Sequence, residues 1–408
     1  MRCGLLGRKL GHSYSPQIHR QLADYDYVLY EKEPVELEDF LRHGDFTGLN
    51  VTIPYKKAVI PYCDALSERA KKLGVVNTLV RRPDGTLIGH NTDYFGFESM
   101  VKRSGLKLVG KKVLVLGSGG ASATTVAVLE ELGTQVIVIS RNGENNYDNI
   151  HLHYDAAAIV NATPVGMYPD TELAPVDLEP FTALEGVLDL VYNPANTALL
   201  QQAQRLGLAA ENGLYMLVAQ AKESAEWFLG SPVSDDLIPT IHKALRMQME
   251  NIVLIGMPGS GKSTVGLQLA QKLGKQFIDA DQKIEETAGK TIPEIFAESG
   301  EDGFRKIESA VLSQLGKQSG LVIATGGGCI TRSENYAYLH QNGTIIWLQR
   351  NIESLPTEGR PLSQAGKLSE MYEIRKPLYE TFSDITVDND CTVSTTVQRI
   401  LSLLEKEA

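Results

Sequence analysis

The chain has 408 residues, 43% of them hydrophobic and 22% charged, which is the composition of a globular protein and excludes a disordered or fibrous chain. At about 150 residues per domain, this length predicts two or three packing units. The 50 acidic and 39 basic residues give a formal net charge of −11. We therefore expect no nucleic-acid partner, and we expect any anionic ligand to be bound by a local site.

The cysteines are too far apart to predict a disulfide framework or a zinc ribbon, since no Cys-x-x-Cys pair occurs among Cys3, Cys63, Cys329 and Cys391. No apolar run approaches the roughly 20 residues of a membrane span. The N-terminal residues also lack the apolar core of a signal peptide. These observations predict a cytoplasmic protein with no membrane association.

Short apolar runs rich in β-forming residues alternate with amphipathic stretches, which is typical of α/β units. Four of these runs predict buried strands: Lys112–Leu116, Gln135–Ile139, Asn251–Ile255 and Leu321–Ala324. Residues 234–250 have the pattern of a capped amphipathic helix that ends where a new strand begins. We place the main domain boundary near Glu250.

A glycine-rich loop follows the predicted strand 251–255 and opens a helix, with Gly256, Gly261, Lys262 and Ser263 at P-loop spacing. In such a loop, backbone N–H groups surround phosphate oxygens, the lysine reaches the β- and γ-phosphates, and the serine hydroxyl is placed for Mg²⁺. The alternative is a glycine-rich surface turn. The motif predicts a nucleoside triphosphate site without naming the acceptor.

Residues downstream of this loop narrow the choice of acceptor. Asp279 and Asp281 are two positions apart, which predicts that both carboxylates lie on one side of an extended segment. Arg305 precedes Glu308 by about one helical turn, which taken alone is typical of a surface ion pair. Three glycines end a strand at 326–328, and two arginines follow late in the chain, Arg360 and Arg375.

This set of motifs, in this order, resembles shikimate kinase from about residue 251 to the C-terminus. The resemblance implies that Asp279 helps to hold Mg²⁺ and that Asp281 binds the shikimate hydroxyls and accepts the proton of the attacking one. It also implies that Arg305 and Arg375 bind the shikimate carboxylate, for which an arginine fork is well shaped. Gly327 would contact the ring, and ATP would contact Arg360 of the lid and the loop residues Gly259, Ser260, Gly261, Lys262, Ser263 and Thr264. The lid segment 355–360 is short and lacks a basic residue often present just before Arg360.

A second glycine turn, with Gly117, Gly119 and Ser122, follows the predicted strand 112–116 and opens a helix, as in dinucleotide-binding folds. The next strand ends in Ser140 and Arg141, where an NAD enzyme carries Asp or Glu. An arginine there suits the 2′-phosphate of NADP, and such a charge-assisted bond contributes about 1.5–3 kcal/mol. The alternative is a solvated arginine at the end of a strand.

Polar residues gather in the otherwise apolar sequence that precedes this turn. They are Ser13, Ser15, Asn50, Thr52, Lys56, Asn77 and Asp93. Hydroxyls, amides, a lysine and a carboxylate are the groups that bind a small polyhydroxylated acid. A lysine beside a carboxylate can also move a proton while hydride is transferred. Considered singly, Lys56 is more typical of a surface residue and Asp93 of a helix N-cap.

Together these motifs resemble shikimate dehydrogenase over residues 3–248. The resemblance implies that Ser13 and Ser15 hold the shikimate carboxylate and that Lys56 and Asp93 form the acid/base pair. The substrate hydroxyls would contact Asn50, Thr52, Asn77, Asp93 and Gln220, with Tyr192 lining the same pocket. NADP would contact Gly117, Ser118, Gly119, Gly120, Ala121, Ser122, Ser140, Arg141, Thr163, Leu190, Gly213 and Met216. One stretch departs from the family, because residues 142–158 have the composition of a loop where a helix and a strand are usual.

We therefore expect an α/β fold: a two-domain dehydrogenase, with an open α/β substrate domain and a Rossmann NADP domain, fused to a P-loop kinase with a parallel sheet of the nucleoside-monophosphate-kinase type. The substrate domain would comprise 1–92 completed by 213–249, the NADP domain 93–212, and the kinase 250–408. The expected function is reduction of 3-dehydroshikimate to shikimate with NADPH, followed by phosphorylation of shikimate with Mg²⁺ and ATP, in a monomer or homodimer. Two alternatives stay open, a dehydrogenase that prefers quinate and a catalytically weak metabolite sensor.

Overall fold

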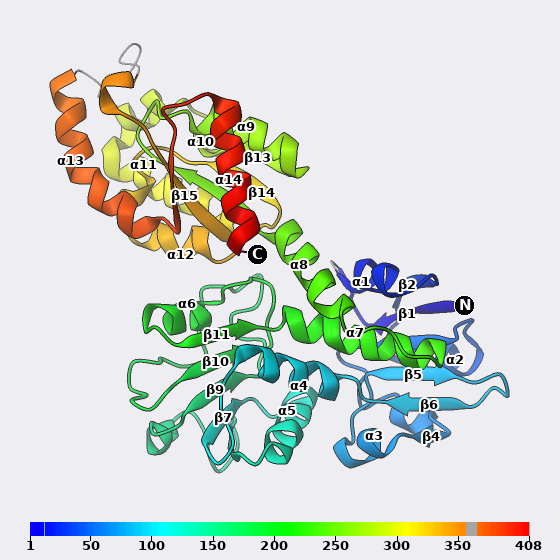
Figure 1. The fold of residues 1–408 in the computed structure, drawn as a ribbon. Coiled ribbons are helices and arrows are strands. Elements are labelled where there is room, and N and C mark those ends of the chain that lie inside the picture. Colours follow the sequence, from blue (N-terminus) through cyan, green and yellow to red (C-terminus); the bar gives the residue numbers. More distant parts are fainter. Residues whose placement is uncertain (12, 356–364, 408) are drawn as a thin grey trace. The chain divides into compact units, whose positions relative to one another are not determined.

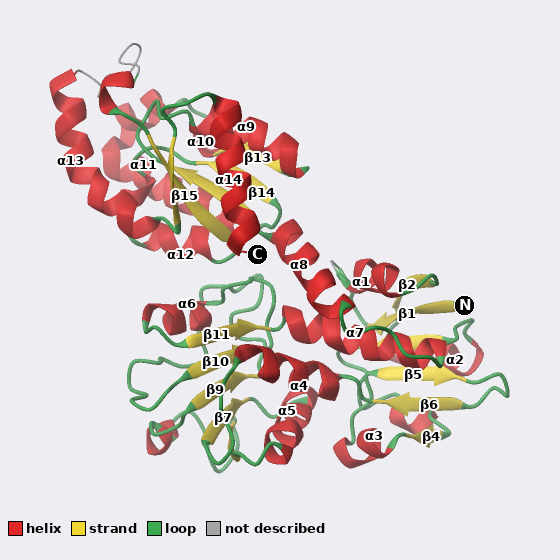
Figure 2. Ribbon diagram, in the orientation of Figure 1, coloured by secondary structure: helices red, strands yellow, loops and turns green. Residues whose placement is uncertain are grey.

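The computed structural model describes residues 1–11, 13–355 and 365–407, in which the chain forms two compact units (Figure 1). Unit 1 consists of Met1–Tyr192 and Leu199–Ala244, and unit 2 of Asn193–Ala198 and Leu245–Ala408. Unit 1 contains two sheets and unit 2 contains one, and helices cover all three (Figure 2). The α/β class is confirmed.

The first sheet of unit 1 has six strands in the order β2-β1-β3-β5-β6-β4, with β1, β2 and β3 parallel. Its strands are β1 (Arg2–Gly7), β2 (Asp26–Glu31), β3 (Gly48–Val51), β4 (Ala65–Leu66), β5 (Thr78–Arg81) and β6 (Leu87–His90). Its helices are α1 (Ser15–Leu22), α2 (Leu37–His43), α3 (Glu68–Leu73) and, from much later in the chain, α7 (Leu214–Leu229). The burial of Leu6, Leu49, Val51 and Leu79 gives this sheet a core of its own.

The second sheet of unit 1 is entirely parallel, in the order β11-β10-β9-β7-β8. Its strands are β7 (Lys112–Leu116), β8 (Gln135–Ile139), β9 (Ala158–Asn161), β10 (Gly186–Asp189) and β11 (Ala209–Asn212). The accompanying helices are α4 (Asp93–Ser104), α5 (Gly120–Glu131) and α6 (Ala198–Arg205). Val113 and Val115 pack on one face of the sheet and Leu114 and Leu116 on the other, because side chains alternate along a strand.

Unit 2 contains a parallel sheet in the order β13-β14-β12-β15-β16. Its strands are β12 (Asn251–Ile255), β13 (Gln276–Asp279), β14 (Leu321–Ala324), β15 (Gly343–Gln349) and β16 (Ile385–Asp388). Its helices are α9 (Lys262–Leu273), α10 (Ala280–Ala288), α11 (Ile292–Gly316), α12 (Glu334–His340), α13 (Ala365–Phe382) and α14 (Val393–Glu407). Two separate hydrophobic cores, one on each face, require helices on both sides of this sheet.

The four strands expected from apolar runs are all present with the predicted bounds. One detail of that prediction is wrong: β8 is only half-buried, because it is the last strand of its sheet and has a neighbour on one side only. The expected helix at 234–250 is α8 (Leu237–Met249), at whose residues 244 and 245 the two units divide. Among the described residues, no helix is both long and apolar enough to span a bilayer.

Candidate active sites

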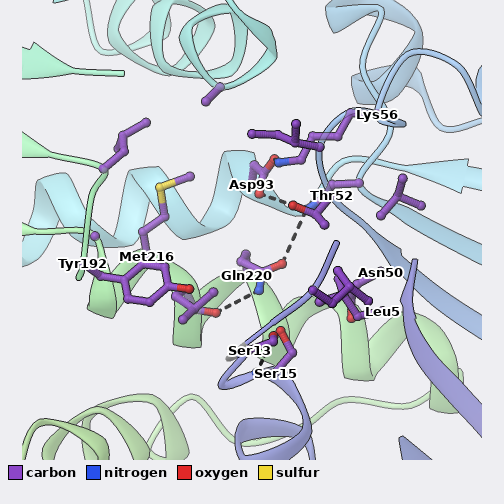
Figure 3. A pocket seen from close by; sticks show the side chains of 18 of the residues that line it. Leu5, Ser13, Ser15, Asn50, Thr52, Lys56, Asp93, Tyr192, Met216 and Gln220 are labelled. Atoms are coloured by element: carbon purple, nitrogen blue, oxygen red, sulfur yellow. Dashed lines mark hydrogen bonds and ion pairs between the residues drawn. The ribbon is translucent and has the colours of Figure 1, made fainter. Parts of the chain in front are cut away.

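A cavity of about 910 Å³ opens in unit 1 at the carboxyl ends of β1 and β3 (Figure 3). The opposite side of the cavity is formed by three segments: the start of α5, the residues after β10 and the first two turns of α7. Every residue expected to bind the dehydrogenase substrate lines it: Ser13, Ser15, Asn50, Thr52, Lys56, Asn77, Asp93, Tyr192 and Gln220. Segments more than 200 residues apart in sequence therefore meet at one site.

Lys56 and Asp93 form an ion pair in this cavity, with Nζ 2.6 Å from Oδ2. The Lys56 side chain is 22% exposed and the Asp93 side chain 8% exposed, so the lysine is the partner that a ligand can reach. Asp93 is the first residue of α4, where the helix dipole favours a negative charge. Its other oxygen, Oδ1, accepts a hydrogen bond of 3.0 Å from Asn77 Nδ2. The carboxylate is thus fixed from two sides and holds the lysine in place.

Amide side chains make up the wall beside this pair. Asn50 lies on β3, Asn77 directly precedes β5, and Gln220 lies on α7. Asn77 Nδ2 also donates to Gln220 Oε1 at 3.4 Å, and Gln220 Nε2 donates to the Leu217 carbonyl at 2.9 Å. These contacts hold the amides at fixed orientations around a space that a small polar molecule can fill.

Ser13 and Ser15 lie where β1 leads into α1, and Ser15 is the first residue of that helix. The Ser15 N–H donates to Ser13 Oγ at 3.3 Å, which keeps the two hydroxyls together. Hydroxyls beside a helix N-terminus suit a carboxylate, because backbone N–H groups there are unpaired and the dipole end is positive.

The turn between β7 and α5 has the geometry of a dinucleotide loop. Gly117 has φ +107°, which favours glycine, and a Cβ there would lie 2.9 Å from Thr163 Cγ2. Ser122 is buried, and its hydroxyl donates to the Gly117 carbonyl at 2.7 Å, so it closes the turn where a third glycine is usual. Of the residues expected to contact NADP, those that line the cavity are Ala121, Leu190, Gly213 and Met216. The others lie outside it: Gly117, Ser118, Gly119, Gly120, Ser122, Ser140, Arg141 and Thr163.

Gly213 permits a close approach that no other residue would, since a Cβ there would collide with the Leu190 carbonyl oxygen. Ser140 and Arg141 follow β8, and the Arg141 side chain is exposed to solvent. The interval between β8 and β9 contains turns and one 3₁₀ segment, Ile150–His153, so the predicted loop is confirmed for residues 142–157, whereas Ala158 already begins β9. Asn146 and Asn149 organise this loop through hydrogen bonds to its backbone.

Nine of the residues that line the cavity had no role predicted from the sequence, and two of them are basic, Arg8 and Lys9. Arg8 and Lys9 directly follow β1, and the carboxyl ends of parallel strands are where ligands bind in open α/β sheets. Their position after the first apolar run was therefore a usable signal. The other seven are apolar and include Met167, which belongs to the segment 161–167 that resembles the cofactor-side strand and turn of the dehydrogenase family.

In unit 2, the P-loop runs from the end of β12 to the start of α9, as expected. Gly256 has φ +145° and Gly261 φ +94°, so both need the freedom of glycine. Lys262 Nζ donates to the carbonyls of Gly256 and Met257 at 2.9 and 3.0 Å. The ammonium thus lies against the first two residues of the loop that contains Gly259 and Ser260, and Ser263 and Thr264 follow Lys262 on α9.

Ser263 Oγ donates to Asp279 Oδ2 at 2.6 Å, which brings together the two oxygen groups expected at Mg²⁺. The hydroxyl and carboxylate oxygens are hard ligands of the kind that Mg²⁺ takes. The expectation of an extended segment is corrected here, because β13 ends at Asp279 and Asp281 already belongs to α10. Asp279 is the N-cap of this helix and accepts from the N–H groups of Asp281 and Gln282. These capping bonds fix the Asp279 carboxylate at the start of the helix on which Asp281 lies.

Asp281 is mostly buried, and burial, followed by the nearby charge of Asp279, raises the pKa of its carboxyl. Lys262 and Arg305 act in the opposite direction. A Cβ on Gly326 would lie 2.8 Å from Asp281 Oδ1 and 2.9 Å from Glu308 Oε1, so both carboxylates approach the glycine turn after β14.

Arg305 and Glu308 form a buried ion pair at 2.7 Å, with side chains 11% and 1% exposed. The interpretation as a surface pair is therefore wrong, because α11 turns this face toward the glycine turn. Arg375 Nη1 and the Tyr379 hydroxyl both donate to the Gly327 carbonyl, at 3.1 and 2.6 Å. The predicted residues Asp281, Arg305, Gly327 and Arg375 are thus neighbours, whereas Arg360 lies outside the described residues.

Comparison with known proteins gives matches to both units. The family model of the shikimate dehydrogenase substrate binding domain matches residues 5–79, and that of shikimate kinase matches residues 258–405. A shikimate dehydrogenase (NADP(+)) of Clostridium perfringens is 34% identical over 265 residues, which cover 60% of this chain and 97% of the relative.

Two solved structures extend the comparison. A chorismate mutase/shikimate 5-dehydrogenase fusion protein from Clostridium acetobutylicum is 35% identical with a TM-score of 0.57, covering 60% of this chain and 96% of that one. Shikimate 5-dehydrogenase from Thermus thermophilus, solved with NADP(H) and shikimate, is 29% identical with a TM-score of 0.55, covering 60% and 99%.

Proposed function

The chain belongs to the shikimate dehydrogenase family and continues into a shikimate kinase domain, which makes it a bifunctional shikimate-pathway enzyme, and we propose that its two sites catalyse consecutive steps. The first site reduces 3-dehydroshikimate to shikimate, and the second phosphorylates the 3-hydroxyl of shikimate. The observation that carries the proposal is the cavity of unit 1, which collects seven predicted polar side chains suited to a small hydroxylated acid around one lysine–carboxylate pair.

In the dehydrogenase site, Ser13 and Ser15 bind the carboxylate while Asn50, Thr52, Asn77 and Gln220 bind hydroxyls. NADPH, when bound, would supply the hydride for carbon 3 of the substrate. Lys56 donates a proton from Nζ to the carbonyl oxygen, so that ketone and hydride together become an alcohol. Asp93 balances the ammonium and orients it through the 2.6 Å contact. Met216 and Gly213 border the nicotinamide side of the cavity.

In the kinase site, the P-loop amides and Lys262 bind the phosphates of ATP. Ser263 and Asp279 would hold Mg²⁺, which would supply positive charge to neutralise the phosphates. Asp281 binds the 3-hydroxyl and accepts its proton as the oxygen attacks the γ-phosphorus. Arg305 and Arg375 bind the carboxylate of shikimate in fork geometry. Arg360, as a lid residue, completes the set.

Two assays on the purified chain test the proposal: reduction of NADP⁺ by shikimate, followed by absorbance, and release of ADP from ATP on addition of shikimate. We expect turnover in both. Turnover of quinate in preference to shikimate would favour the quinate alternative for the first site. Absence of turnover in both assays would leave only the metabolite-sensing alternative and refute the proposal.

The proposal extends to the organisation of the chain. Residues 1–92 and 213–249 form the substrate domain, 93–212 the NADP domain and 250–408 the kinase. A cytoplasmic location is supported by the four cysteines, none of which forms a disulfide within the described residues. The quaternary state is a monomer or homodimer, to be determined by light scattering.

The choice of NADP over NAD is assigned to Arg141, which follows β8 with an exposed side chain. Replacing it by alanine removes a charge-assisted bond to the 2′-phosphate, and we expect the preference for NADP to fall by about ten- to a hundredfold. The measurement is the ratio of kcat/KM for the two cofactors. Arg205→Ala, at an exposed arginine on α6, is the matched control. An unchanged ratio in Arg141→Ala would show that another residue recognises the phosphate.

A further inference from the structure

Ser224 lies one helical turn beyond Gln220 on α7 and is completely buried. It does not line the cavity of unit 1, and the proposed reaction gives it no role. Its hydroxyl nevertheless lies within hydrogen-bonding distance of four groups that belong to the substrate wall or stand directly behind it. Ser224 is therefore the centre of a buried polar network.

The direction of these hydrogen bonds follows from proton counting. Ser224 has a single O–H, which donates to the Gln220 carbonyl at 2.9 Å. Toward Asn50 Nδ2 the oxygen must therefore accept, and its second lone pair is left for one of the two threonine hydroxyls. Its shortest contact is with Asn50 Nδ2, at 2.7 Å, while Thr92 and Thr78 place their hydroxyl oxygens at 2.9 and 3.0 Å.

This direction determines how the Asn50 amide is turned. Because Ser224 accepts, the nitrogen of Asn50 must face it, and the second N–H of the same nitrogen donates to Thr78 Oγ1 at 3.3 Å. The carbonyl oxygen, Oδ1, is then on the opposite side, where it accepts from the Tyr27 hydroxyl at 2.8 Å. Both donors of Asn50 are used inside the protein, and what remains for a ligand in the cavity is the second lone pair of Oδ1.

We propose that Ser224 is a positioning residue for substrate recognition: it locks the Asn50 amide so that this wall of the cavity accepts, and does not donate, a hydrogen bond. A hydroxyl of the substrate satisfies such an acceptor, and a carbonyl at the same place does not. This inference rests on the proposed dehydrogenase function and extends it to a residue that never touches the substrate.

The test is a double-mutant cycle on the full chain, with Ser224→Ala, Asn50→Ala and the pair, measured with shikimate and NADP⁺. Loss of Ser224 lets the Asn50 amide reorient, so we expect KM for shikimate to rise about three- to tenfold, with kcat changed less than about twofold. In the Asn50→Ala background the same Ser224 substitution is expected to leave KM unchanged, because its effect passes through Asn50.

Thr125→Val is the matched control, since Thr125 on α5 is also a completely buried hydroxyl of unit 1 and its Oγ1 has no hydrogen-bond partner among the described residues. It should leave KM unchanged. If Ser224→Ala lowers the thermal unfolding midpoint, Ser224→Thr, which keeps the hydroxyl, is measured instead. A KM near that of the parent chain then supports the proposal, and a raised KM contradicts it.

The proposal is overturned if Ser224→Ala leaves KM as it was, or if it raises KM equally with and without the Asn50 side chain. Failure of the proposed function gives a different result, namely no shikimate oxidation by the unsubstituted chain. Kinase turnover of each variant, measured in the same preparation, reports whether unit 2 remains intact.

Discussion

Lys56→Ala is expected to lower the turnover of shikimate oxidation by about 10²–10⁴-fold, the range typical of losing a general acid/base. Lys56 is the partially exposed member of the pair with Asp93, so it is the group that can exchange a proton with the substrate oxygen. Alanine leaves Asp93 without a counter-charge. In the oxidation, the substrate hydroxyl then has no lysine to accept its proton, and in the reduction the ketone oxygen has no lysine to donate one. The measurement is kcat for NADP⁺ reduction at saturating shikimate.

The matched control for this variant is Lys57→Ala, which removes the neighbouring lysine, whose side chain is exposed. It should retain the activity of the parent chain. The kinase rate of Lys56→Ala should also be unchanged, since the residues proposed for that reaction all lie in unit 2. A Lys56→Ala enzyme that oxidises shikimate at the original rate would remove Lys56 from the proton-transfer role.

Lys262→Ala and Asp281→Asn are each expected to abolish phosphorylation of shikimate, to below about 1% of the original rate, while leaving shikimate oxidation unchanged. Catalysis of phosphoryl transfer depends mostly on positioning and on charge neutralisation. Lys262 supplies the positive charge inside the loop, and Asp281 supplies the acceptor for the proton of the attacking hydroxyl. The measurement is ADP release on addition of shikimate, and Lys272→Ala, an exposed lysine later on α9, is the control.

The pH profile of the kinase adds an independent test of Asp281. Burial and the charge of Asp279 raise the pKa of Asp281, and only the ionised carboxylate can accept a proton. Activity should therefore fall as the pH decreases through this raised pKa, in a range above that of an ordinary aspartate. Phosphorylation that persists in Asp281→Asn would contradict the role of Asp281 as the base.

Much of both sites could be predicted because their residues stand at element ends. Asn50 ends a strand, Asp93 begins a helix and Lys262 follows a glycine loop, and such positions can be read from local patterns of apolar and turn-forming residues. Their gathering around one cavity follows from the way parallel strands bring their carboxyl ends to one edge of a sheet.

What could not be predicted depends on side-chain direction and on packing. The place of Asp281 on a helix depends on the chain entering α10 directly after the extended N-cap residue Asp279. The burial of Arg305 and Glu308 depends on which face α11 presents, and a spacing of three residues is the same on either face. Ser224 could not be predicted for a related reason: a serine within a helix does not reveal which amide it meets on the sheet against which the helix packs.

Helix α7 packs against the first sheet of unit 1, but it lies much later in the chain than the strands of that sheet. It is therefore synthesised long after them. Asn50 and Ser224, which bond to each other, are 174 residues apart in the chain. At about 5–20 residues per second, a ribosome needs roughly 10–35 s to make that interval. During synthesis, the first sheet therefore emerges with the face that α7 will cover still open, and the whole second sheet is made before the first can be completed. The order of translation thus means that the substrate pocket cannot be completed until α7 has been made.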